Sequence, residues 1–104
     1  MKILFDQGTP APLRKVLVGH LVSTAFEEGW SNLTNGELLA ISEERFDLFI
    51  TTDQNLRYQQ NLADRQLAIL VLPTTSWPEI QRHVAEIVEA ADSIKAREYV
   101  ELSW

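Results

Sequence analysis

Cysteine is absent from the 104 residues of this chain, and histidine occurs only 2 times. Without cysteine there are no disulfides, no thiolate metal sites and no cysteine nucleophiles. Two histidines also do not favour a histidine-rich zinc site. The side chains that remain as candidates for catalysis or metal binding are the carboxylates of its 15 Asp and Glu residues.

Long apolar runs are missing as well. No stretch approaches the roughly 18 residues that a membrane helix requires. The opening apolar run from Met1 to Phe5 is cut off at Asp6 before the apolar region of a signal peptide can develop. We therefore expect a cytoplasmic protein without a membrane segment.

Positive charge is scarce, because 9 Lys and Arg face 15 Asp and Glu and give a net charge of −6. This balance argues against tight, non-specific binding to a phosphate backbone. It does not exclude a nuclease, since a bound divalent cation inverts the local charge. With 45% hydrophobic residues the chain is long enough for one core, and we expect a single domain over 1–104.

Short apolar runs that end at polar or turn-forming residues predict the strands. They lie at 2–5, 20–25, 47–52 and 66–73, and the last is the most apolar. The tail at 99–104 alternates and fits either an edge strand or a segment that docks on a partner. Strands that alternate with helices predict an α/β fold with a mainly parallel sheet of four to five strands.

Helical patterns separate these strands. We expect a first helix that begins after an N-cap at Thr9 and ends at Gly19, and a second that begins at the capping box Thr34–Glu37 and ends near Arg45. A short helix is expected over 55–62. The longest is expected over 77–96, and it begins with a second capping box at Ser76.

Two aspartates follow directly after apolar strands. Asp6 follows the first strand and Asp53 follows the third. In parallel sheets ligands bind beyond the carboxyl ends of the strands, so neighbouring strands would bring both carboxylates into one crevice. Glu37, in the first turn of its helix, supplies a third carboxylate if that turn faces the crevice. Such an oxygen-only set suits Mg²⁺ or Mn²⁺ and predicts metal-assisted phosphodiester hydrolysis.

Each of these acids also has a purely structural interpretation. Asp6 suits a turn ahead of Gly8, Glu37 satisfies backbone N–H groups in its capping box, and Asp53 suits an N-cap. From the residues alone both interpretations stay open.

Other polar residues are weaker candidates. Arg57 and Tyr58, just beyond Asp53, suit contact with a phosphate and stacking on a base, although neither needs such a role on a helix surface. His20 and His83 are interpreted as surface or boundary residues rather than ligands.

Three segments together resemble the PIN-like domain family of small bacterial proteins of unknown function, which are related to the ribonuclease toxins of toxin–antitoxin pairs. The opening M-K-I-L-F-D-Q-G-T-P resembles the family's M-K-I-L-L-D-E-N-L-P. The segment F-D-L-F-I-T-T-D-Q-N-L resembles its strand followed by T-x-D-x-D/N-F, and N-G-E-L-L-A-I-S resembles its helix start. The resemblance covers roughly residues 1–72 and implies a three-layer α/β/α sandwich.

The resemblance also implies a site. It assigns the catalytic and metal-binding acids to Asp6, Glu37 and Asp53, with Thr51 in support. Asn55 stands where many relatives carry a fourth acid; an amide still ligates a cation or orients its water, but it lowers the charge of the site. Gln7 stands where close relatives often carry Glu.

The implied function is a divalent-metal-dependent ribonuclease acting on single-stranded RNA. A further interpretation keeps the toxin context, in which the activity exists but an antitoxin or other partner protein covers the site. The alternative is a catalytically weak or inactive PIN-like module that binds a partner protein or nucleic acid. The resemblance further implies a homodimer.

Overall fold

A parallel sheet of five strands forms the centre of the fold in this computed structural model, which describes residues 1–56 and 65–104. All neighbouring strands pair in parallel, in the order β2-β1-β3-β4-β5. The strands are β1 (Lys2–Phe5), β2 (Leu21–Thr24), β3 (Leu48–Thr51), β4 (Ala68–Val71) and β5 (Tyr99–Glu101). The four strands predicted from apolar runs are confirmed, and the tail contributes the fifth as an edge strand.

Strands β1 and β3 are direct neighbours, as the proposed crevice requires. Their register pairs Ile3 with Leu48 and Phe5 with Ile50. The backbone N–H of Asp6 donates to Ile50 O over 3.2 Å, which extends the pairing by one residue. The polar segments after β1 and β3 therefore leave the sheet side by side.

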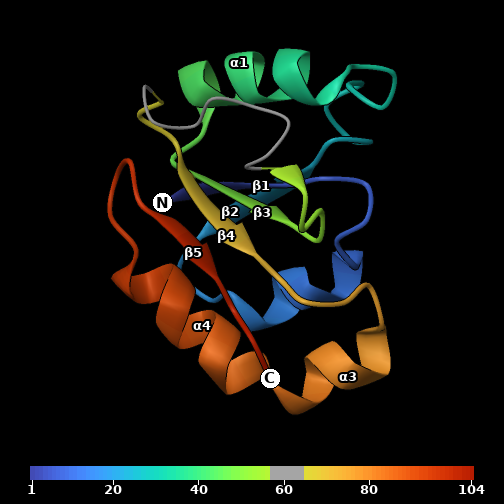
Figure 1. The fold of residues 1–104 in the computed structure, drawn as a ribbon, viewed down its shortest axis with the longest axis vertical. Helices are drawn as coiled ribbons and strands as arrows, with labels where there is room; N and C mark the ends of the chain where they lie inside the picture. The colour runs from blue at the N-terminus through green and yellow to red at the C-terminus, as the bar shows by residue number, and fades with distance from the viewer. Residues whose placement is uncertain (57–64) are drawn as a thin grey trace.

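Both faces of the sheet are covered by helices. Successive strand residues point to opposite faces, so Ile3 and Phe5 enter one buried cluster and Leu4 enters another. Helix α1 (Asn35–Arg45) lies over one face. The 3-10 helix η1 (Ala11–Val16), α3 (Trp77–Arg82) and α4 (Val84–Ser93) lie over the other (Figure 1). Burial on both faces explains why the central strands are continuous apolar runs.

Helix α1 begins at the predicted capping box. The Thr34 hydroxyl accepts from Glu37 N–H over 3.2 Å, and a Glu37 carboxylate oxygen accepts from Thr34 N–H over 3.0 Å. The helix ends at Arg45, so its predicted bounds are confirmed.

The predicted helix from Thr9 to Gly19 is wrong in type and length. Only Ala11–Val16 is helical, and it is a 3-10 helix whose preceding residue is Pro10. Leu13 N–H bonds to Pro10 O and Leu17 N–H to Arg14 O, three residues back in each case. Thr9 is not the N-cap, because its hydroxyl donates to Asp6 and to Ile50 O instead.

The predicted helix over 77–96 is divided at His83, whose φ of −121° leaves the helical region. The imidazole of His83 stacks on the Trp104 ring, with centroids 4.3 Å apart and planes 10° apart. This contact with a residue distant in sequence accompanies the break. At the start of α3 the Ser76 hydroxyl accepts from Glu79 N–H over 3.4 Å.

The expected short helix over 55–62 falls almost entirely outside the described residues, as do Arg57 and Tyr58. Across 1–56 and 65–104, every helix is too short or too polar to cross a membrane.

Candidate functional site

Asp6 and Asp53 are linked through the hydroxyl of Thr51. Thr51 is the last residue of β3 and is buried. Its Oγ1 donates to Asp6 Oδ2 and accepts from the backbone N–H of Asp53 over 3.0 Å. The two aspartates that follow neighbouring strands therefore belong to one hydrogen-bonded cluster at the carboxyl edge of the sheet.

The Asp6 carboxylate is surrounded by donors. Besides Thr51, it accepts at Oδ1 from the Thr9 hydroxyl over 2.7 Å and from Thr9 N–H over 3.1 Å. Burial raises the pKa of Asp6 above its ordinary value, and repulsion from Asp53 acts in the same direction, whereas the hydrogen bonds from Thr51 and Thr9 lower it. The charged form of this partly buried acid is disfavoured, and a bound cation would stabilise it.

Asp53 is held by two asparagines. Its Oδ1 accepts from the backbone N–H of Asn55 over 3.0 Å, which is a local turn that aspartate favours. Its Oδ2 accepts from the side-chain amide of Asn35 over 3.1 Å. Asn35 is the first residue of α1, so the start of this helix reaches the site through an amide.

Glu37 lies two residues further along α1, and its carboxylate serves the capping box. Hydrogen bonds from the Thr34 backbone and hydroxyl groups lower the pKa of Glu37. Within the described parts of the chain, no group of three or more His, Cys, Asp or Glu side chains has an arrangement that would hold a metal ion. The structure thus brings Asp6 and Asp53 together and does not bring Glu37 to them.

Gly8 occupies the turn between Asp6 and Thr9. A Cβ at this position would lie 2.5 Å from Thr52 Oγ1 and 3.9 Å from Asp6 Oδ1. The close approach of the two polar segments after β1 and β3 therefore favours a residue without a side chain, because any Cβ would displace the Thr52 hydroxyl.

A pocket of about 580 Å³ opens beside Asp6. Its lining comes from the turn after β1, from the end of β2 and from the start of α3: Asp6, Gln7, Gly8, Thr9, Pro10, Ala11, Thr24, Phe26, Thr75 and Trp77. Asp6 is the only charged side chain among these residues.

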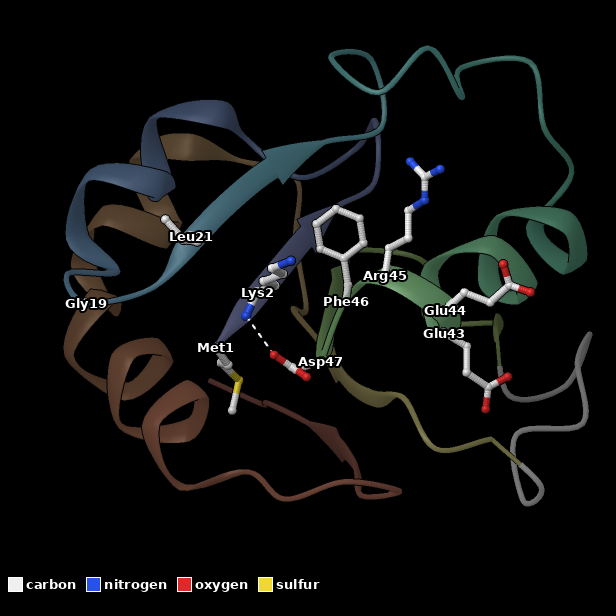
Figure 2. Close-up of a pocket in the computed structure, with 9 residues that line it drawn as sticks. All are labelled: Met1, Lys2, Gly19, Leu21, Glu43, Glu44, Arg45, Phe46 and Asp47. Carbon is white, nitrogen blue, oxygen red and sulfur yellow. Dashed lines mark hydrogen bonds between the residues drawn. The ribbon is translucent and has the colours of Figure 1, made fainter.

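A second pocket, of about 520 Å³, lies at the opposite, amino-terminal edge of the sheet (Figure 2). Two of its acids already have structural partners. Asp47 accepts from Lys2 N–H over 2.8 Å, and Glu43 accepts from Gln66 N–H over 2.6 Å and pairs with Arg65. These acids hold the turns before the strands, so the candidate chemistry lies at the carboxyl edge.

Neither histidine takes part in the site. His20 Nε2 lies 2.7 Å from Asp92 Oδ1, and His83 Nδ1 lies 2.9 Å from Glu86 Oε1. Each imidazole is within hydrogen-bond distance of a carboxylate outside the site, in agreement with the interpretation of both histidines as surface or boundary residues.

Sequence reasoning missed Thr9 and Asn35 as partners of the two aspartates. The spacing of Asp6 and Thr9 carries a local signal, because an aspartate favours hydrogen bonds to polar groups a few residues on. Asn35 and Asp53 are 18 residues apart in sequence, and only the packing of α1 on the sheet brings them together.

Comparison with known proteins gives no match: no protein-family model, curated protein or solved structure matches this chain.

Proposed function

We propose that this chain is a PIN-like nuclease, with the three-layer α/β/α architecture of that family, which hydrolyses phosphodiester bonds in single-stranded RNA with the help of a divalent cation. The parallel sheet covered on both faces supports the proposed fold.

The observation that carries the proposal is the linkage of Asp6 to Asp53 through Thr51 at the ends of neighbouring parallel strands. Ligands of open parallel sheets bind at this edge. Two carboxylates whose charges repel each other are suited to receive a cation rather than a free anionic substrate.

The donors at this site fit Mg²⁺ or Mn²⁺. These hard cations use oxygen ligands and commonly take one or two protein carboxylates, leaving the other positions to water and to substrate phosphates. Asp6 and Asp53 supply the two carboxylates. When bound, the cation would lower the pKa of a water and neutralise charge on the attacked phosphate.

The other residues position these two acids. Thr51 and Thr9 fix the orientation of the Asp6 carboxylate, while Asn35 and the backbone of Asn55 fix that of Asp53. Glu37, which the resemblance assigns to the metal, serves in this proposal to start α1 and so to place Asn35.

The second candidate is a PIN-like module that binds nucleic acid or a partner protein without cleaving it. Two observations favour it: the helix start reaches Asp53 through the amide of Asn35 rather than a carboxylate, and no Lys or Arg lines the pocket beside Asp6 among the described residues.

A cleavage assay separates the two candidates. The purified protein is incubated with single-stranded RNA and Mn²⁺, beside the Asp6→Asn/Asp53→Asn double variant. The Asp47→Asn variant is the matched control, because it makes the same substitution at the opposite edge of the sheet. We expect cleavage by the wild type and Asp47→Asn and none by the double variant. Equal cleavage by all three proteins would show that the activity does not depend on Asp6 and Asp53. Absence of cleavage by all three would favour the binding module.

A further inference from the structure

Phe26 is a large apolar side chain that is 77% exposed and stands at the rim of the pocket beside Asp6. Exposed aromatic rings next to a concave surface commonly mark a binding site, since their burial by a ligand is favourable. Trp77 lines the same pocket from the start of α3.

The turn that carries Phe26 is firmly hydrogen-bonded. Ala25 is buried, and its N–H donates to Phe5 O over 2.8 Å. Within the turn, Gly29 N–H donates to Phe26 O over 3.1 Å and Trp30 N–H to Ala25 O over 2.9 Å. Phe26 is therefore presented to solvent by an ordered backbone, so little freedom remains to be lost when a ligand covers the ring.

Trp77 is anchored in a different way. Its ring packs partly against the buried cluster beneath the sheet, and Ser76 caps the helix that it begins. The pocket thus has one aromatic wall fixed by core packing and one presented by a tight turn.

The remaining lining is almost uncharged. Apart from Asp6 it offers amide and hydroxyl groups from Gln7, Thr24 and Thr75. A phosphate would find no Lys or Arg among these described residues and would be repelled by Asp6. A flat, neutral group with polar edges fits better, because it stacks on a ring and bonds to neutral side chains.

We infer that this pocket binds a nucleobase of the single-stranded substrate through stacking on Phe26 and Trp77, next to the phosphodiester that a divalent cation at Asp6 and Asp53 would hold. The inference rests on the proposed function: Asp6 lines this pocket and is also one of the two acids proposed to bind the cation. A base joined by its ribose to the phosphate at that pair would lie in the adjoining pocket.

The test measures binding in the absence of divalent metal, so that it does not depend on cleavage. A labelled single-stranded RNA is titrated by fluorescence anisotropy against the wild type, Phe26→Ala and Phe26→Tyr. Leu21→Ala is the matched control, because Leu21 is also an apolar residue with an exposed side chain, 70% exposed, but lies at the amino end of β2, on the opposite edge of the sheet. We expect Phe26→Ala to weaken binding about tenfold, and Phe26→Tyr and Leu21→Ala to bind as the wild type does.

A second probe separates the base from the backbone. An oligomer of the same length with abasic riboses should bind weakly, and equally so to the wild type and Phe26→Ala. Equal binding of normal RNA by the wild type and Phe26→Ala, or no RNA binding by either, would overturn the inference. If Phe26→Ala instead abolished self-association and left RNA binding intact, the surface would belong to a protein contact and the inference would fail. Loss of cleavage in the aspartate variants with base-dependent binding retained would support the pocket independently of the chemistry.

Discussion

Asp6 is a partly buried acid whose pKa is raised mainly by burial. The native state therefore holds its proton more tightly than the unfolded chain does, and the stability that this group contributes falls as the pH rises from about 3.8 through the raised native value. Once ionised, at pH values above the raised native pKa, the carboxylate destabilises the fold relative to its protonated form, as is common for functional groups held ready for a ligand.

Replacing Asp6 by Asn removes this charge and keeps the side-chain shape and the acceptor for Thr9, whereas the amide NH₂ takes the place of Oδ2 and can donate to Thr51 Oγ1. We expect Asp6→Asn to increase the free energy of unfolding at pH 7 by about 1 kcal/mol, and this gain to shrink towards zero at pH values below the ordinary aspartate range. Chemical unfolding at pH 7 and pH 3 measures both values. A variant that is less stable than the wild type at pH 7 would contradict the unfavourable ionisation of Asp6.

Gly8 provides a second test at the level of a single residue. In Gly8→Ala the new Cβ would meet Thr52 Oγ1 at 2.5 Å, which forces the threonine from its rotamer at a cost of about 1 kcal/mol. We expect the variant to be less stable by that amount and to lose cation-dependent cleavage, because the turn also carries Asp6.

Thr52→Ala added to Gly8→Ala should restore stability, since it removes the obstructing hydroxyl. The Thr52→Ala single variant serves as the control. If the double variant were as unstable as Gly8→Ala alone, the crowding between these two segments would not be the cause.

Among the secondary-structure elements, helix α1 links the capping box to the site. Thr34 and Glu37 exchange hydrogen bonds at its start, and Asn35 between them reaches Asp53. The lowered pKa of Glu37 means that this acid stabilises the native state above its ordinary pKa of 4.5 and that the contribution is lost as the pH falls through the lower native value. Its pH dependence is therefore opposite in sign to that of Asp6.

We expect Thr34→Ala to cost about 1 kcal/mol of stability. Glu37→Ala should lower the melting temperature at pH 7 and have little effect at pH values below the lowered native pKa of this acid. Glu37→Gln, which retains a capping side chain, should cleave RNA at a rate close to that of the wild type. Loss of cleavage in a folded Glu37→Gln would instead support a direct role for this carboxylate.

The elements also show which features local sequence encodes. The strands and α1 were predictable because apolar runs and a capping box are local signals. The division of the 77–96 helix at His83 was not, because it accompanies a stack on Trp104, 21 residues further on. Within the site, Asp6 and Asp53 were predictable from strand ends in a parallel sheet, and Thr51 followed from the family resemblance. Asn35 was not predictable, because its contact depends on how α1 packs.

For the whole molecule, the net charge of −6 limits how nucleic acid can bind. Binding through bases rather than phosphates releases few counterions. We expect a plot of log affinity for single-stranded RNA against log salt concentration to have a slope shallower than about −1.5, equivalent to roughly two phosphate contacts. Anisotropy titrations at salt concentrations from low to physiological give this slope. A slope clearly steeper than the expected value would show that a basic surface elsewhere on the protein dominates RNA binding.

The central claim is that Asp6 and Asp53 form one divalent-cation site. Titration with Mn²⁺, followed by the electron paramagnetic resonance signal of the free ion, tests it without any substrate. We predict one Mn²⁺ bound per chain by the wild type and by Asp47→Asn, with affinity reduced at least about tenfold in the folded Asp6→Asn/Asp53→Asn variant. Equal Mn²⁺ binding by the wild type and the double variant, or no binding by the wild type, would contradict the claim.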